Sequence, residues 1–260
     1  LVSDTKSNSE ADSGSGILLD PLQSCNNESS TATVNPNTLI EKNSGSGVVL
    51  RNGAMIQMRG AIADNEEGGI IASGPGTSVR IRNLASCAGG LEQEGCVPPT
   101  LGNNRLAGVA VGQGSELIMD SALIFGTQAK DDDDTNLDNF GDGVVADAPA
   151  SLVVTRSRVV ESERAGLVVI NEVLSNGAFP AISVNSSSFE ESPYGGVWIT
   201  PKEASKAGIN TCRSRRRDPS SSLPWAFRPQ EHHWSTEAWR HWRSWPKQSW
   251  SPLRGQSHRL

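Results

Sequence analysis

The stretch that decides the fold covers residues 143–160 and reads GVVADAPASLVVTRSRVV. It opens with a glycine and an aliphatic run, and continues through the turn-like segment Ala148-Pro-Ala-Ser. It ends in the pattern apolar-x-x-Ser-x-apolar, which is formed by Val154, Ser157 and Val159. Short runs of Val, Ile and Leu between Gly, Ser and Pro turns are typical of β-strands. The stretch therefore predicts two or three short strands separated by tight turns.

The same glycine-aliphatic start recurs along the chain, at Gly16, Gly47, Gly69, Gly108, Gly143, Gly166 and Gly196. Successive starts lie 22 to 39 residues apart, and the two shortest intervals of 22 and 23 residues indicate the basic unit. The serine pattern recurs at Ile118/Ser121/Leu123 and at Val184/Ser187/Phe189. One unit cannot bury its apolar face alone, whereas stacked units can, with their strands paired in parallel about 4.8 Å apart. The repeat predicts a parallel β-solenoid in which the serines form a ladder.

These starts, serine patterns and spacings resemble right-handed parallel β-helix repeat proteins of the pectin-lyase-like superfamily. The resemblance covers about residues 16–201 and is to secreted or surface-attached bacterial members that carry no recognisable enzyme motif. It implies an all-β, right-handed parallel β-helix with three sheets, of about seven coils here, an extracellular location and a carbohydrate-related role. A helical solenoid is disfavoured, because residues 1–201 lack amphipathic helical patterns. A β-sandwich is the structural alternative, although it does not require the recurring spacing.

Composition divides the chain into a polar N-terminal segment at 1–15, the repeats at 16–201 and a basic tail at 202–260. Residues 1–201 carry a net charge of −14, whereas residues 202–260 carry +8, all four histidines and six of the seven tryptophans. The tail is interpreted either as a basic-aromatic binding segment or as the product of an out-of-frame translation. We expect little ordered structure in it and predict no nucleic-acid partner.

The cysteines and the apolar runs bear on the cellular location. Cys87 and Cys96 bracket a glycine-rich loop and could close it as a disulfide, which suits an oxidising compartment. The alternative is two unpaired thiols, and the pairing of Cys25 and Cys212 is left open. No stretch approaches the roughly 18 apolar residues of a membrane-spanning helix. We expect an extracellular or cell-surface protein whose signal peptide is not in the chain.

Two long insertions, residues 86–106 and 126–142, follow what the repeat spacing indicates to be equivalent corners of consecutive units. We therefore expect them to lie side by side and to build up one face. The second insertion is acidic, and Asp134, Asn136 and Asp138 have the alternating oxygen spacing of a calcium loop. It departs from an EF-hand because it lacks the required glycine and glutamate, so a solvated acidic loop is the alternative. Calcium is the only cofactor that the sequence indicates.

Three residues outside the tail are candidates for a ligand-binding face. Arg156 and Arg158 lie on either side of Ser157, so both could face outward, although an ordinary exposed strand has the same pattern. Trp198 could stack on a sugar ring, or it could be a core residue that covers the end of the solenoid.

The function that best fits the sequence is a structural or interaction module that contacts polysaccharide or another cell-surface component. The alternative is a polysaccharide lyase or glycoside hydrolase with its site on the face built by the two insertions. Residues 1–201 contain no histidine, and no catalytic residue is predicted. Convergence of three or more charged side chains on one sheet beside both insertions would favour the enzyme.

Overall fold

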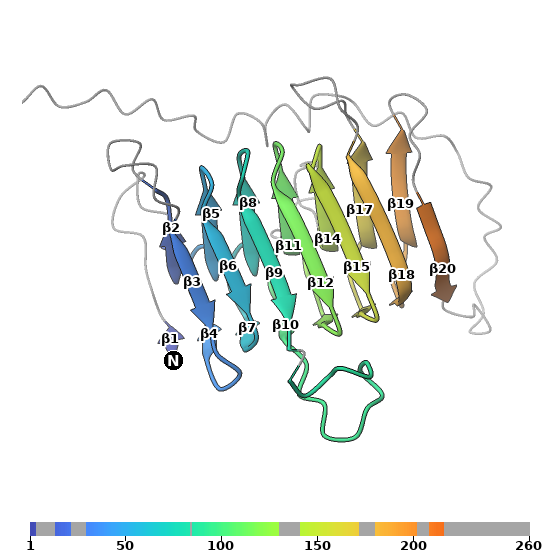
Figure 1. Ribbon diagram of the computed structural model, residues 1–260, viewed down its shortest axis with the longest axis horizontal. Coiled ribbons are helices and arrows are strands. Elements are labelled where there is room, and N and C mark those ends of the chain that lie inside the picture. Colours follow the sequence, from blue (N-terminus) through green and yellow to red (C-terminus); the bar gives the residue numbers. More distant parts are fainter. Residues whose placement is uncertain are drawn as a thin grey trace, which may run out of the picture.

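The computed structural model describes residues 1–3, 14–21, 30–83, 85–129, 141–171, 180–201 and 208–215. Every element in these segments is a β-strand, and every strand pair is parallel (Figure 1). The predicted all-β, parallel architecture is confirmed. Cys25, the calcium candidates Asp134, Asn136 and Asp138, and residues 216–260 lie outside the described residues.

One sheet contains the glycine-aliphatic starts, and its seven strands follow one another in chain order. The strands are β2 (Ile17–Leu19), β5 (Val48–Arg51), β8 (Ile70–Ser73), β11 (Ala107–Gly112), β14 (Asp142–Asp147), β17 (Ala165–Asn171) and β19 (Gly195–Pro201). Each strand pairs with the corresponding strand of the next unit, so the recurring starts are stacked in space.

The remaining strands form a second sheet of two runs that meet at β18 (Ala181–Glu190). The β3–β18 run contains β3 (Thr31–Val34), β6 (Met55–Met58), β9 (Ser78–Arg82), β12 (Glu116–Asp120), β15 (Ser151–Thr155) and the first half of β18. The β1–β16 run contains β1 (Val2–Ser3), β4 (Leu39–Glu41), β7 (Ala61–Ala63), β10 (Thr100–Gly102), β13 (Leu123–Phe125) and β16 (Arg158–Val160), and β16 pairs with the second half of β18. Strand β20 (Gly208–Arg215) pairs along both halves of β18 and lies beyond residue 201, in the segment assigned above to the tail.

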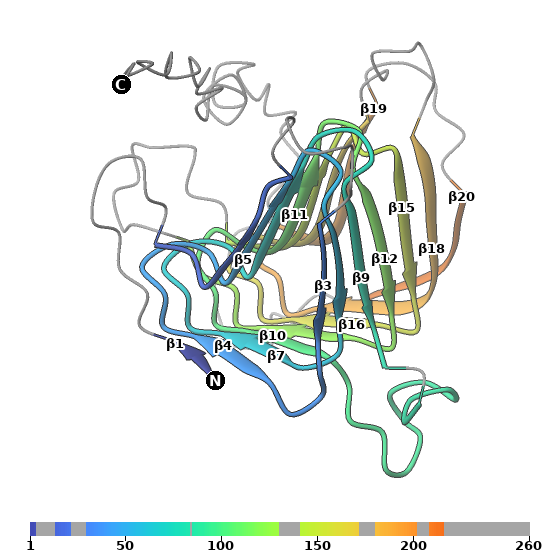
Figure 2. The same cartoon turned by 60° about the vertical axis from the view of Figure 1, so that its left-hand side comes forward.

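The three groups of strands surround a common apolar interior (Figure 2). Alternate residues of each strand point inward because successive side chains of a strand face opposite sides of the sheet. Ile56, Ile81, Met119, Ile124 and Phe189 are among the fully buried side chains of this core. The core therefore runs along the whole stack rather than lying at one point.

A ladder of asparagines fixes the turns that lead into the seven-stranded sheet. The Nδ2 group of Asn43 donates to Oδ1 of Asn65, and Nδ2 of Asn65 donates to Oδ1 of Asn104, both at 2.8 Å. All three side chains are buried, so these bonds satisfy amide groups that would otherwise be costly to remove from water.

The serine ladder is present, but one predicted member is wrong. The backbone N–H of Ser157 donates to Oγ of Ser187 at 3.1 Å, and the N–H of Ala122 donates to Oγ of Ser157 at 3.2 Å. The strand register therefore places Ala122, not Ser121, in the ladder. The physical reason is that Met119 is the side chain of β12 that fills the core, which shifts the alternation by one residue.

The predicted side-by-side placement holds for only the end of the first insertion. Residues 103–106 follow β10 and lie beside residues 125–128, which follow β13. The longer part of the first insertion, with the disulfide, joins β9 to β10 and enters the β1–β16 run at Thr100, whereas the second insertion leaves that run after Phe125. In a parallel run, the strands all begin at one edge and end at the other, so the predicted built-up face is wrong for the disulfide-bonded part.

Candidate functional site

The outer face of the β3–β18 run forms the front layer in Figure 1. Its outward rows mix polar and aliphatic side chains, and parallel pairing places Gln57, Arg80, Ile118, Val153 and Ser183 in one of them. These residues alternate with buried neighbours, because each strand of the run turns one side to the core. The face is continuous over six strands.

Three arginines lie together on this face, on the neighbouring strands β6 and β9. Arg80 and Arg82 alternate with the buried Val79 and Ile81 on β9. Arg59 follows Met58, the pairing partner of Ile81, and so lies beside Arg82. Adjacent strands are about 4.8 Å apart and alternate residues about 7 Å apart, so the three side chains start from one small area. We call this group the arginine cluster.

The arginine cluster is not neutralised by the described part of the chain. None of Arg59, Arg80 and Arg82 forms an ion pair there, and the buried Nε atoms of Arg80 and Arg82 have no hydrogen-bond partner. All three side chains are half-buried. Like charges at this spacing repel one another, and guanidinium groups match carboxylate or sulfate groups with two parallel hydrogen bonds. The cluster is therefore suited to an anionic ligand.

The carboxylate nearest to this cluster is already occupied. Asp120 lies directly opposite Arg82 on β12. It accepts hydrogen bonds from Nε of Arg156 at 3.0 Å and from Nη2 of Arg156 at 2.7 Å. This hydrogen bonding raises the pKa of the Arg156 guanidinium. Asp120 is held by Arg156 and leaves Arg82 unpaired.

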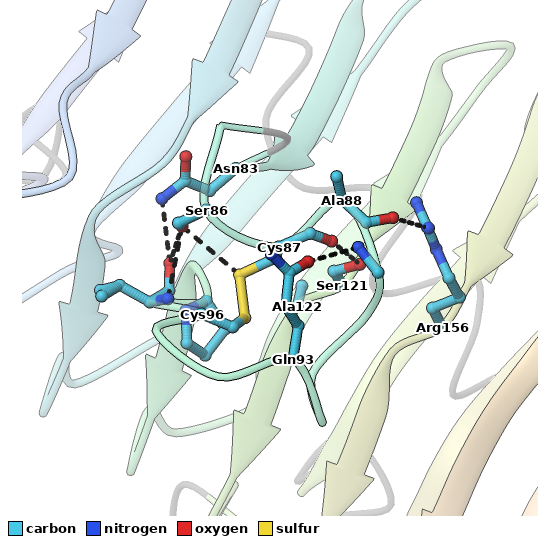
Figure 3. The surroundings of a disulfide bond; sticks show 12 residues. Asn83, Ser86, Cys87, Ala88, Gln93, Cys96, Ser121, Ala122 and Arg156 are labelled. Carbon is cyan, nitrogen blue, oxygen red and sulfur yellow. Dashed lines mark hydrogen bonds between the residues drawn. A yellow bond between two sulfur atoms is a disulfide. The ribbon is translucent and has the colours of Figure 1, made fainter.

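The disulfide loop, residues 85–97, borders the face (Figure 3). Cys87 and Cys96 form a disulfide, and Cys87 is fully buried. The hydroxyl of Ser121 donates to the carbonyl of Cys87 at 3.2 Å, and Nη1 of Arg156 donates to the carbonyl of Ala88. The loop is thus fixed to the corners that follow β12 and β15. The arginine cluster lies on the preceding strands of the same run, β6 and β9.

The predicted ligand-face residues lie in three different places. Arg156 is at the corner between β15 and β16, where it joins Asp120 to the disulfide loop. Arg158 begins β16 and pairs with Glu190 at 3.2 Å. Trp198 lies on β19, the last strand of the seven-stranded sheet, opposite Val168. Only Arg156 therefore borders the arginine cluster.

The sequence does contain a signal for the arginine cluster. The segment Ser78-Val-Arg-Ile-Arg82 alternates apolar and basic residues, which indicates a strand with one buried and one charged side. It has no glycine-aliphatic start and no serine pattern, so the repeat motifs do not identify it.

Two further observations bear on ligands and membranes. Within the described ranges, no group of three or more histidine, cysteine or acidic side chains is arranged to hold a metal ion. No helix in those ranges is long and apolar enough to cross a membrane.

Comparison of the chain with models of known protein families, with curated proteins and with solved structures found no match. The functional argument therefore depends on the residues and geometry of the β3–β18 face.

Proposed function

We propose that this chain is a right-handed parallel β-helix that acts outside the cell as an interaction module and binds an acidic polysaccharide. The binding surface is the outer face of the β3–β18 run around the arginine cluster. The single observation that carries the proposal is that Arg59, Arg80 and Arg82 lie together on the outward side of the sheet and form no ion pair with the residues that the structure describes.

The β-helix assignment is supported by the order of the strands. The chain passes from the seven-stranded sheet to the β3–β18 run, then to the β1–β16 run, and back to the seven-stranded sheet one strand further on. A chain that repeats this circuit winds as a helix of strands. Parallel strands joined by crossovers are right-handed in almost all proteins, which supports the right-handed sense.

An extracellular location is supported by the disulfide. Cys87 and Cys96 form a disulfide. Disulfides persist in oxidising compartments and are rare in the cytosol. Polysaccharides of cell walls, capsules and matrices are ligands that a protein in such a compartment meets.

An acidic polymer fits the cluster better than a neutral sugar. Neutral sugars are commonly held by stacking on aromatic rings, and the outward rows of this face contain no aromatic side chain among the described residues. Three guanidinium groups provide up to three two-point contacts with carboxylate or sulfate groups. Successive strands present these contacts across the sheet, so an extended polymer can reach several of them.

The test compares an Arg80→Gln/Arg82→Gln double variant with an Arg51→Gln control. Arg51 ends β5 in the other sheet, so its loss leaves the proposed face unchanged. Charge-assisted hydrogen bonds contribute about 1.5–3 kcal/mol each, so the double variant should bind at least about tenfold more weakly. Affinity electrophoresis and calorimetry with polygalacturonate, alginate, dextran sulfate and a neutral glucan measure the effect.

Binding to the charged polymers should also weaken as salt is added, because the contacts are electrostatic. Thermal unfolding of each variant shows that the fold is retained. If the wild-type chain binds none of the charged polymers, or if it binds the neutral glucan equally well, the proposal is wrong.

The enzyme alternative is less well supported by this face. Glu116 and Asp120 are the carboxylates of its described outward rows, and they are four residues apart on one strand. That places their backbones about 13 Å apart, whereas glycosidases hold their carboxyl pair within about 10 Å. Asp120 is also held by Arg156, which makes it a poor general base. Incubation with the same polymers should therefore release no shortened or unsaturated product.

A further inference from the structure

The outer face of the seven-stranded sheet carries an aliphatic row that is nearly free of solvent. Pairing aligns this row across five strands, and its members are 2–9% exposed: Val49, Ile71, Ala110, Val145 and Val168. These side chains point away from the main core, because their neighbours Val48 and Leu50 on β5, for example, point into it. We call this set the outer aliphatic row.

Burial of the outer aliphatic row differs from that of comparable positions in the same molecule. The outward residues Gln57, Ile118 and Val153 of the β3–β18 run are only half-buried. Leu18 belongs to the same row, since it pairs with Val49, yet it is 53% exposed. Stacking within a sheet therefore does not account for the low exposure between β5 and β17.

The described part of the chain places no strand over the outer aliphatic row (Figure 2). Ile71, Ala107, Ala110 and Val145 form an apolar cluster of their own, separate from the main core. Apolar side chains that are buried although no described strand lies over them indicate a contact with another segment or another molecule.

We propose that residues 234–245 of the same chain dock on the outer aliphatic row through Trp239, Trp242 and Trp245. Three-residue spacing places these indoles on one side of a short helix, which Pro246 would end. Twelve helical residues are about 18 Å long, and five parallel strands span about 19 Å. Trp239 and Trp245 are six residues or about 9 Å apart in a helix, so the three indoles cover about half the length of the row.

The path of the chain brings this segment to the correct side of the molecule. The last residues of β20 pair with the half of β18 that also pairs with β16. In each earlier unit, the chain passes from this position to the next strand of the seven-stranded sheet. The described part of β20 therefore ends, at Arg215, at the position from which each earlier unit leads into the sheet that carries the row.

Charge and side-chain type favour the same contact. Residues 202–260 carry a net charge of +8, and residues 1–201 carry −14, so the tail is attracted to the rest of the chain. An indole buries 150–250 Å² when it packs, which is the kind of cover that a flat aliphatic row requires. The contact is independent of polysaccharide binding, which uses the other sheet.

Tryptophan fluorescence of the full chain tests the contact. A Trp198→Phe background leaves only the six tryptophans of the tail and keeps an aromatic ring at this position, which continues the row on β19. We expect their emission to be blue-shifted and protected from acrylamide, relative to the same chain in denaturant. Adding Val145→Lys, which changes the member of the row on β14, should shift the emission to the red and increase quenching. The matched variant Val153→Lys, on the outer face of β15, should change neither.

A reciprocal set of variants changes only the tail. Trp239→Ala/Trp242→Ala/Trp245→Ala should uncover the row and increase the fluorescence of an added apolar dye, whereas Trp250→Ala should not. Because these changes lie outside the strands, they remain informative if Val145→Lys fails to fold. The proposal is overturned if Val145→Lys and Val153→Lys behave alike, if the triple variant binds no more dye than wild type, or if sedimentation shows that a second copy covers the row.

Discussion

At the residue scale, one buried ion pair shows how the corners of the fold tolerate charge. Asp142 opens β14 and is fully buried, and it accepts hydrogen bonds from Nε of Arg164 at 2.9 Å and from the N–H of Ala165 at 3.0 Å. Burial raises the pKa of Asp142, and the contacts with Arg164 oppose that rise. Burial removes water from the Asp142 carboxylate, which disfavours its charged form. The hydrogen bonds and positive charge of Arg164 supply most of the compensation for that cost.

Replacing Arg164 with methionine should destabilise the fold by about 3–5 kcal/mol at neutral pH, because it leaves a buried carboxylate unpaired. Between the ordinary Asp142 pKa of 3.8 and its raised folded value, the native state binds more protons than the unfolded state. Stability therefore rises as the pH falls through that window, and the deficit of Arg164→Met should shrink there. Urea unfolding at several pH values measures both effects.

The control for this prediction is Arg158→Met, which removes the partner of Glu190. The Arg158 side chain is 50% exposed, so its pair is screened by water and its loss should cost less than about 1 kcal/mol. A similar loss in the two variants, or a deficit of Arg164→Met that does not change with pH, would contradict the assignment of a buried, raised Asp142.

At the element scale, the disulfide loop is held both covalently and by hydrogen bonds to the neighbouring units. Asn83 donates from Nδ2 to the carbonyl of Val97 at 2.9 Å, which closes the base of the loop. Ser121 and Arg156 attach the other side of the loop to the corners after β12 and β15. The loop therefore connects three consecutive units.

Removing the disulfide by Cys87→Ala/Cys96→Ala should lower the free energy of unfolding by about 2–3 kcal/mol, because the unfolded chain loses a closed loop. Proteolysis should then increase within residues 88–95, while the circular dichroism of the strands is unchanged. Ser121→Ala is the graded control: it removes the hydroxyl that bonds to the Cys87 carbonyl and to Oδ1 of Asp120, and it should cost about 1 kcal/mol without exposing the loop to protease. Cleavage at strands rather than within the loop would show that the disulfide supports the stack itself.

The same elements show what could be predicted from the sequence. The glycine-aliphatic starts identify the seven-stranded sheet, because an uninterrupted apolar run indicates a strand that is buried on both sides. The register of β12 could not be fixed in this way, since Leu117, Ile118 and Met119 are all apolar and alternation is lost. Unit length also does not reveal which corner holds an insertion. The sequence therefore does not show that the disulfide-bonded part of residues 86–106 precedes β10 while only residues 103–106 follow it.

The asparagines show a further regularity of the sequence. Asn43, Asn65 and Asn104 each precede a glycine-aliphatic start by four residues. That spacing indicates the asparagine ladder, whose amides can bond only to one another and to nearby carbonyls once they are buried. The arginine cluster was less predictable, because unpaired arginines become informative only when the register places Arg59 beside Arg82.

At the scale of the whole molecule, each strand pairs only with its counterparts in the neighbouring units. One row of the core illustrates this, since Met58 pairs with Ile81, Ile81 with Met119, and Met119 with Val154. Stability in such a stack is approximately a sum of unit terms and nearest-neighbour terms. A defect should therefore act mainly on the unit that contains it and on the two adjacent units.

Met119→Ala and Met58→Ala test this directly, because both side chains are fully buried in the same row and lose the same atoms. Each cavity should cost about 2–5 kcal/mol. Hydrogen exchange with mass spectrometry should locate the losses differently: Met119→Ala should reduce protection in β9, β12 and β15, whereas Met58→Ala should reduce it in β3, β6 and β9. Equal loss of protection over all strands in both variants would mean that the stack unfolds as one cooperative unit, and the nearest-neighbour description would then fail.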